Sequence, residues 1–372
     1  MGSAVPENRR MPDPRRRALK FVLTIGVLSF FADFVYEGSR SIVGPYLGSL
    51  QASAAVIAFV AGFGELAGYV LRLASGRLAD LTRKFWPIMI FGYVVQMTSV
   101  PALALTHSWP SAAALVVLER MGKAIRNPSR DVMLSHAGKH IGYGWVFGLH
   151  EGLDQTGALM GPLLVAAVLA YQGDYHHAFA LLIIPAALNL SCLGLARWLY
   201  PRPQELETGS PRVGGRRFSR LYWVYLAGAA LVAAGFVDYP LIAYHLNHNK
   251  VAPGPWVAIF YSVAMAASGS GSLLFGRLFD RFGFNILVGL TLLSVTFAPL
   301  VFLGPFWIAL LGVGVWGLSI GVHESLIPAA VAPLVPAERR ASAFGLFTAG
   351  YGIAWFVGSG LLRVLLTPGL ER

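Results

Sequence analysis

Charged residues and cysteine are scarce in this chain. Of its 372 residues, 13% are charged, 18 are Asp or Glu, and one is cysteine, Cys192. A single cysteine excludes an internal disulfide. No glycine-rich loop precedes a Lys-Ser or Lys-Thr pair, which argues against an ATP-driven pump. Since 56% of the residues are hydrophobic, the composition is far from that of a soluble domain, and water is not the main solvent.

Enzymatic chemistry and nucleic-acid binding have little support in the sequence. Glu151 and Asp154 resemble a hydrolytic pair, but no nucleophile or metal cluster stands at a recognisable spacing from them. His176 and His177 lack metal-ligating partners at helical spacing. The net charge of +11 comes from cations between apolar runs rather than from a basic face of a soluble domain. We therefore expect no enzyme, no cofactor, no metal site and no nucleic-acid partner.

Long apolar runs dominate what is present. About 20 helical residues cross the hydrocarbon core of a bilayer, and eleven runs reach about that length. The sequence therefore predicts an all-α integral membrane protein with eleven spans. They cover residues 19–48, 54–75, 86–106, 109–127, 142–171, 176–199, 220–246, 254–275, 284–303, 306–333 and 341–366.

Lys and Arg gather on alternate connections between these runs. Cytoplasmic loops carry an excess of these residues, so the amino terminus and the connections after the even-numbered spans are predicted to face the cytoplasm. The opposite connections contain Lys250 and almost nothing else. The basic connections hold Arg9, Arg10, Arg15 to Arg17, Lys20, Arg77, Arg83, Lys84, Arg126, Arg130, Lys139, Arg202, Arg212, Arg216, Arg217, Arg277, Arg281, Arg339 and Arg340.

One short signature occurs twice. Gly76-Arg77-Leu78-Ala79-Asp80 and Gly276-Arg277-Leu278-Phe279-Asp280 begin 200 residues apart, as duplication of a helical bundle would leave them. The sequence predicts a basic tail (1–18), a six-helix bundle (19–199), a cytoplasmic linker (200–219), a five-helix bundle (220–366) and a tail (367–372). Six spans per half would need a twelfth helix after Leu366, so a peripheral helix is predicted to be absent or clipped.

These signatures resemble those of the major facilitator superfamily of secondary transporters. The resemblance implies two pseudo-symmetric bundles, with the signature regions closing the cytoplasmic gate; a solvated loop charge is the alternative for each residue. The resemblance implies that the aspartate of each signature caps or pairs with a neighbouring helix, while the basic residues grip the end of that helix. Asp80 with Arg77, and Asp280 with Arg277, are the candidates, since an aspartate near a helix amino terminus complements the helix dipole. The full set of expected gate residues is Gly76, Arg77, Asp80, Arg83, Lys84, Gly276, Arg277, Asp280 and Arg281.

Two further signatures match the family in part. Leu118 to Lys123 is similar to its fourth-helix pattern, in which an embedded arginine assists proton transfer, and Arg120 is the equivalent here. Gly157 to Pro162 resembles the fifth-helix pattern of drug/proton antiporters. Small residues four apart also let two membrane helices approach closely, so simple packing explains Gly157, Gly161 and Pro162 equally well.

Ionisable residues inside the spans are the strongest candidates for a site, because a charge at the bilayer centre costs about 2.5–3.5 kcal/mol on insertion scales. Asp33, Glu37 and Arg40 share one helical stripe, and Glu65 and Arg72 share another. Ion pairing along each helix is the structural alternative. The full cavity set is Asp33, Glu37, Arg40, Glu65, Arg72, Glu119, Arg120, His150, Glu151, Asp154, Asp238, His323 and Glu324.

Within that set, we expect Asp33 or Glu37 to take the proton, with Arg120 controlling its pKa and His150, Glu151 and Asp154 forming a relay. The predicted function is proton-coupled export of a small organic compound by alternating access. Proton-coupled uptake of a sugar, organic acid or other metabolite is the alternative, and a receptor or assembly protein is a third. The expected partners are the inner or plasma membrane bilayer, the substrate and protons, with the protein acting as a monomer.

Overall fold

The computed structural model describes residues 13–206, 218–237, 239–252 and 254–370, and all regular structure in these ranges is helical. Nine of the described helical segments are long and apolar enough to cross a membrane. The predicted all-α membrane class is thus confirmed. The helices are α1 (Pro14–Ser49), α2 (Ala54–Thr82), α3 (Phe85–Ala102), α4 (Trp109–Ile141), α5 (Tyr143–Gln172), α6 (Tyr175–Leu181), α7 (Ile183–Leu199), α8 (Arg220–Ala234), α9 (Tyr239–His248), α10 (Gly254–Phe282), α11 (Phe284–Val295), α12 (Phe297–Leu303), α13 (Phe306–Val331) and α14 (Arg340–Leu370), with short 3-10 turns η1 (Leu103–Leu105), η2 (Pro203–Leu206), η3 (Ala332–Leu334) and η4 (Ala337–Arg339).

Local sequence sets where the helices begin and end. Asp13 and Ser53 accept hydrogen bonds from backbone N–H groups in the first turns of α1 and α2, as N-cap residues do. Gly173 ends α5 in the left-handed conformation, which glycine adopts without steric cost. Between the ends, large apolar side chains such as Leu231 and Leu303 face outward and are 76% and 84% exposed. Such extensive exposed apolar surface is expected of helices that face lipid.

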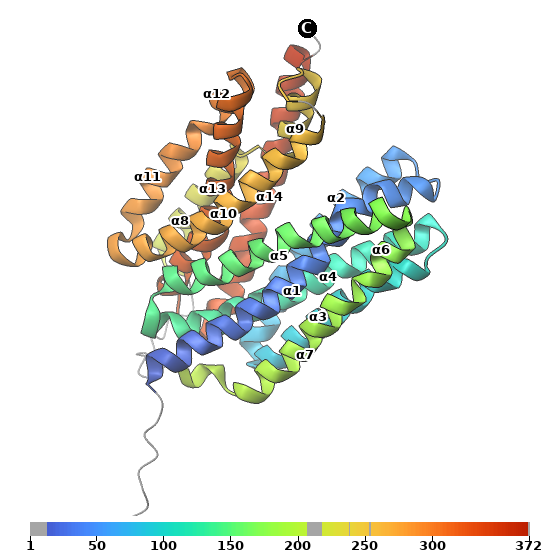
Figure 1. Ribbon diagram of the computed structural model, residues 1–372. Helices are drawn as coiled ribbons and strands as arrows, with labels where there is room; N and C mark the ends of the chain where they lie inside the picture. The colour runs from blue at the N-terminus through green and yellow to red at the C-terminus, as the bar shows by residue number, and fades with distance from the viewer. Residues whose placement is uncertain (1–12, 207–217, 238, 253, 371–372) are drawn as a thin grey trace, which may run out of the picture.

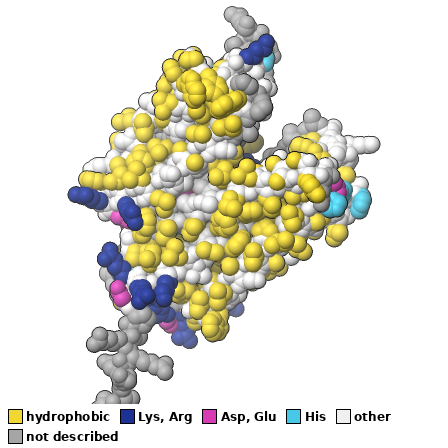
Figure 2. All heavy atoms as spheres, in the orientation of Figure 1, with side chains coloured by type: hydrophobic (Ala, Val, Ile, Leu, Met, Phe, Trp, Pro, Cys, Tyr) yellow, Lys and Arg dark blue, Asp and Glu magenta, His cyan; other side chains and the backbone are white. Residues whose placement is uncertain are grey.

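Most of the exposed Lys and Arg side chains lie at one end of the molecule, which we call the basic end. Figure 2 shows Lys and Arg side chains gathered there, next to a surface covered largely by hydrophobic side chains. The basic end is where α2 and α10 finish, after Arg77 and Arg281 respectively. We call the other end, which carries His107 and His176, the open end.

Helices α1 to α7 and helices α8 to α14 form two groups that contact each other mainly through α5 with α10 and α13, and through α14 with α2 and α4 (Figure 1). Backbones meet closely at the basic end. Gly144 lies against Gly276, and Gly148 lies against Ser272, so closely that neither glycine has room for a Cβ atom. We call these groups the first half and the second half.

The two halves part toward the open end. The glycine contacts between α5 and α10 reach Gly269, which lies against Gln155, although α5 continues to Gln172 and α10 starts at Gly254. In Figure 1, α9 and α12 stand well away from α2 and α6, and Figure 2 shows a notch in the surface between the two groups. The molecule is therefore closed at the basic end and hollowed at the open end.

Three expectations about the segments need correction. The fourth span does not end near residue 127, because α4 runs on to Ile141. The predicted single span 220–246 contains two helices, since α8 ends at Ala234 and α9 begins at Tyr239. The repeated signatures are not loops: both lie within the last turns of α2 and α10. Most of the expected linker lies outside the described residues.

Candidate functional site

The two signature aspartates join the halves at the basic end. Asp80 of α2 accepts hydrogen bonds from the backbone N–H groups of Ala341 and Ser342 in the first turn of α14, at 3.1 and 2.7 Å. Asp280 of α10 accepts from Gly144 and Trp145 in the first turn of α5, at 2.8 and 2.7 Å. Each carboxylate thus meets the positive end of a helix dipole of the opposite half.

The cations of the signatures lie around these contacts and are not paired with the aspartates among the described ion pairs. The Arg277 guanidinium lies 3.8 Å from the ring centroid of Trp145. Arg77, Lys84 and Arg281 are exposed, and Arg83 ends α2 with a φ of 58°. Asp80 and Asp280 therefore cap a neighbouring helix, as expected, while Arg77 and Arg277 form no ion pair with them among the described ion pairs.

Arg340 is a basic-end residue whose position the sequence did not indicate, because it was counted only as a loop cation. It is buried, and its Nε donates to the carbonyl oxygen of Ala332 at 3.3 Å. Its terminal nitrogens lie 3.4 Å from Ser135 Oγ and from the Tyr143 hydroxyl. Arg340 thus adds a third polar contact between the halves.

Asp33 lies inside the first half between two cations of α4. Lys123 Nζ is 3.4 Å and Arg126 Nη2 is 3.6 Å from Asp33 Oδ1. Arg126 is completely buried, and it donates from Nε to Gln96 Oε1 at 2.7 Å and from Nη1 to the Tyr93 hydroxyl at 3.0 Å. The sequence places Arg126 in a connection between spans. It lies within α4 instead, because α4 is longer than predicted.

The acids of the two charged stripes, on α1 and α2, have different kinds of partner. Glu37 pairs with Arg40 along α1 at 3.2 Å, as the spacing allows. Glu65 does not pair with Arg72 along α2; Arg120 of α4 reaches it at 2.7 Å. Arg72 instead lies over the ring of Tyr69, at 5.6 Å from its centroid. Helix α4 therefore supplies cations to the acids of both α1 and α2.

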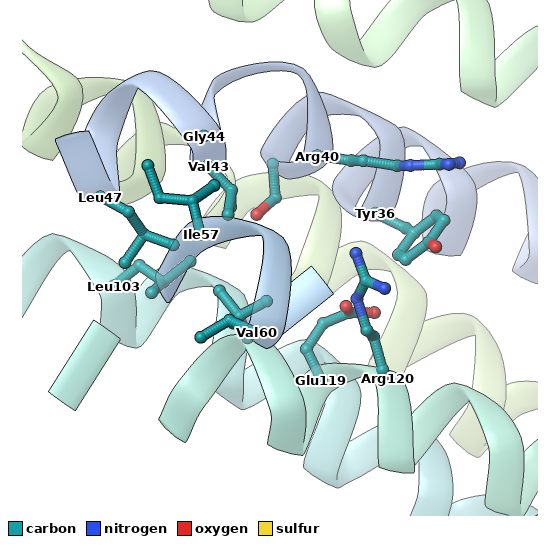
Figure 3. Close-up of a pocket in the computed structure, with 12 residues that line it drawn as sticks. Tyr36, Arg40, Val43, Gly44, Leu47, Ile57, Val60, Leu103, Glu119 and Arg120 are labelled. Atoms are coloured by element: carbon teal, nitrogen blue, oxygen red, sulfur yellow. The ribbon is translucent and has the colours of Figure 1, made fainter. Parts of the chain in front are cut away.

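A cavity of about 140 Å³ opens beside these pairs. Figure 3 shows its apolar side chains gathered at one end, while Tyr36, Arg40, Glu119 and Arg120 lie at the other. Glu119 is buried and accepts a hydrogen bond from Gln96 Nε2 at 3.1 Å. The complete lining is Tyr36, Ser39, Arg40, Val43, Gly44, Leu47, Ile57, Val60, Leu103, Val116, Glu119 and Arg120. Such a cavity suits a molecule with one polar and one apolar end.

The expected relay on α5 is divided among different partners. His150 Nε2 lies 2.7 Å from Ser29 Oγ of α1. Asp154 lies close enough to Asp33 for their carboxyl groups to interact. Glu151 is joined through the Gln155 side chain to Glu324. His150 is thus not placed in a chain with the two acids.

In the second half, His323 Nδ1 lies 3.0 Å from the Tyr351 hydroxyl. Its neighbour Glu324 has a different partner, the side chain of Gln155. Asp238 lies outside the described residues.

The small residues of α5 pack against α1. A Cβ atom on Gly157 would collide with the carbonyl oxygen of Phe30, and one on Gly161 would collide with that of Phe34. Pro162 follows within the same helix. Helix packing accounts for Gly157 and Gly161. A role of this motif in antiport stays a prediction.

No group of three or more His, Cys, Asp or Glu side chains within the described ranges could hold a metal ion. His176 and His177 contact Asp174, at 3.1 and 2.7 Å, and Asp174 lies between two candidate spans. The backbone N–H of His176 donates to Asp174 and lowers the pKa of that carboxyl to about 2. Asp174 is the N-cap of α6, so a local structural role explains the cluster.

Sequence comparison identifies the family to which this chain belongs. The model of the Major Facilitator Superfamily matches residues 25–359. The chain belongs to the major facilitator superfamily. An uncharacterised protein of Mycobacterium tuberculosis is 39% identical over 356 residues, which cover 94% of this chain and 87% of the relative.

Solved structures of the superfamily share the fold of this chain. A human organic anion transporter superposes with a TM-score of 0.74 at 14% identity, covering 95% of this chain and 94% of the other. A bacterial homologue of the iron transporter ferroportin, in its outward-facing state, gives 0.69 at 16% identity, covering 94% and 93%. As a major facilitator protein, the chain is a multi-pass membrane transporter. The family also implies that it is not an enzyme.

Proposed function

We propose that this major facilitator protein is a proton-coupled carrier that exports a small organic compound by alternating access. Its basic end faces the cytoplasm, in keeping with the positive-inside bias, and the membrane is the inner or plasma membrane. The protein works as a monomer, with no cofactor other than the proton gradient.

The observation that carries the proposal is the one-sided closure of the molecule. Asp80 and Asp280 hold the first turns of α14 and α5 at the basic end, while the halves part toward the open end (Figure 1). Alternating access needs one state that is closed at the basic end, as here, and a second state that is closed at the open end. Because each contact is a small set of hydrogen bonds to a charged group, worth about 1.5–3 kcal/mol each, the basic end is able to reopen.

The cavity beside α1, α2 and α4 supports a small organic substrate. Its apolar end would take a hydrocarbon or ring portion, and Tyr36, Arg40, Glu119 and Arg120 would meet a polar group. Solved structures with this fold include a human organic anion transporter and a bacterial homologue of the iron transporter ferroportin, so the fold does not name the cargo. Within the described residues no metal cluster favours iron for this chain.

Proton coupling is supported by acids buried inside the bundle. Asp33 and Glu37, the two acids favoured by the sequence, each contact a cation. A carboxylate beside a cation is held in its charged form. Glu119, Glu151 and Glu324 have no Lys or Arg within 4.0 Å among the described ion pairs, which makes them further candidates for the proton.

A thermal-shift screen of the purified protein, at two pH values and with candidate compounds, identifies a ligand by the stabilisation that it gives. That compound is then loaded into proteoliposomes, and its flux is followed under an imposed pH gradient. Export by antiport predicts that the compound leaves the compartment that protons enter. Uptake by symport predicts movement in the same direction as the protons.

Asp174→Asn serves as the matched control, since Asp174 lies outside the spans and the cavity. Flux that is independent of the pH gradient in the wild type contradicts proton coupling. Maleimide labelling of single cysteines placed at the basic end in intact cells tests the orientation. Labelling by an impermeant reagent from outside would contradict a cytoplasmic basic end.

A further inference from the structure

One side chain joins two carboxyl groups across the contact between the halves. Gln155 of α5 donates from its Nε2 atom to Glu151 Oε1 at 2.7 Å and to Glu324 Oε2 at 2.8 Å. Glu151 belongs to α5 in the first half, whereas Glu324 belongs to α13 in the second half. A primary amide has two N–H donors, so both are used in this bridge.

The bridge lies where the two halves begin to part. Gln155 is the residue that meets Gly269 of α10, beyond which the glycine contacts between α5 and α10 stop. Glu151 is eight residues from the start of α5, which corresponds to about 12 Å of helix above the basic end. The bridge therefore forms the floor of the hollow that faces the open end.

The two carboxyl groups differ in their access to that hollow. Glu151 and Gln155 are 6% and 9% exposed. Glu324 is exposed, although its neighbours His323 and Ser325 are buried. Because Glu324 is both exposed and bonded to Gln155 of the opposite half, its exposed face lies where the halves part, and we infer that water and protons from the open end reach it.

The charge around the bridge is mostly acidic. The charges that act on Glu151 come from Glu324 and Asp154. Lys123 is the cation that acts on Glu324, and it already contacts Asp33. The titratable and charged groups that act on the bridge from the surrounding helices include Asp33 and Glu37 of α1, Lys123 of α4, Asp154 of α5, Tyr261 of α10 and Tyr351 of α14, and His323 of α13 is next to Glu324 and contacts Tyr351.

We propose that Glu151 and Glu324, held together by Gln155, form the proton-binding site of the carrier and that the two halves share it. The buried Glu151 carboxylate is costly when it is charged and uncompensated, and a second carboxylate on the same amide, that of Glu324, repels it. A proton that arrives through the hollow binds a carboxylate oxygen and removes one of the two negative charges. Gln155 is a positioning residue, because it holds the two acids at one place.

This site gives the proton a direct effect on the contact between α5 and α13. With a proton bound, the amide bridge joins the halves without like-charge repulsion. Without it, two carboxylates face each other across the contact and favour its separation. The inference rests on the proposed proton coupling, to which it adds the residues and their position between the halves.

Infrared difference spectra of the purified wild-type protein, between mildly acidic and mildly alkaline buffer, test the site without any substrate. Protonated carboxyl groups give a C=O stretching band that carboxylates and carboxamides lack. We expect the double variant Glu151→Gln/Glu324→Gln to lose a component of this band. Each single variant should change the size of this component or the pH at which it appears, since the acids titrate as a coupled pair.

Gln155→Met keeps the length of the side chain and removes both donors. The component of the C=O band should remain but move in frequency, because the carboxyl groups lose a hydrogen-bond donor. A purely structural role of Gln155 would not cause this shift in frequency. Asp174→Asn is the control and should leave the component unchanged, since the low pKa of Asp174 lies outside this range of pH. Thermal unfolding in detergent checks that each variant is folded.

An unchanged band in the folded double variant, or in both folded single variants, overturns the proposal. The spectra and the transport assay can fail separately. A lost component together with transport that ignores the pH gradient leaves the proton site standing and contradicts coupled transport. Transport that follows the gradient with an unchanged band places the coupling proton elsewhere.

Discussion

The interiors of the two halves differ although their signatures repeat. In the first half, buried polar groups form a network in which Arg126 contacts Asp33, Gln96 and Tyr93. In the second half, the ring of Phe236 contacts Trp316, His323 and Trp355, with centroids 4.8 to 6.2 Å apart. Duplication has thus preserved the contacts at the basic end while the interiors have diverged. One half offers charge, and the other offers aromatic surface.

The largest expected effect tests whether charge holds the first half together. Arg126→Gln leaves Asp33 with one cation and leaves Gln96 and Tyr93 without their partner. Breaking a buried ion pair on one side costs about 3–5 kcal/mol, so we expect a large drop in the midpoint of thermal unfolding in detergent.

Two variants of the second half provide the comparison. Trp316→Phe removes the indole N–H that donates to the carbonyl oxygen of Val237 at 2.8 Å, and leaving that buried acceptor unsatisfied costs about 1–3 kcal/mol. Arg220→Gln changes an exposed residue and should stay within about 0.5 kcal/mol. If Arg126→Gln were as mild as Arg220→Gln, the network of the first half would not be a stabilising feature.

The basic end should respond in the same way to changes in either half. Asp80→Asn and Asp280→Asn each weaken the hold of a carboxylate on two N–H groups of a helix terminus. We expect several-fold faster maleimide labelling of Ser135→Cys, a buried position 3.4 Å from Arg340, with Cys192→Ser as the background. Equal acceleration by both variants would support equivalent contacts, and acceleration by one alone would show that the duplicated contacts have diverged in function.

The smallest expected effect lies at the N-cap of α6, far from both interiors. Because the pKa of Asp174 is lowered to about 2, its charge stabilises the fold above its usual pKa of about 4. That stabilisation is lost as the pH falls from about 4 toward about 2. Asp174→Asn keeps an N-cap acceptor and should match the wild type in thermal unfolding only at the lowest pH. Asp174→Ala loses the cap as well and should cost about 0.5 kcal/mol at neutral pH. A pH-independent difference between the wild type and Asp174→Asn would contradict this assignment.

Hydropathy and the repeat predicted the fold, because both depend on the length and pattern of segments. Each predicted span corresponds to a helix or a helix pair, and the repeated aspartates do meet the opposite half. Charge partners could not be predicted in the same way. Arg126 was assigned to a loop because α4 continues for about four turns beyond its apolar run. Glu65 was matched with Arg72 by spacing along one helix, but the rotation of α4 brings Arg120 to it. Gln155, a neutral residue among acids, gave no signal in the sequence.

The glycine contact of α5 with α10 has a mechanical consequence. Where Gly144 and Gly148 meet Gly276 and Ser272, main chain touches main chain, so neither Gly144 nor Gly148 has a side chain that must change rotamer when the surfaces move apart. A larger residue at either position would hold the two backbones apart, and we expect it to slow the closing of the basic end during the carrier's cycle.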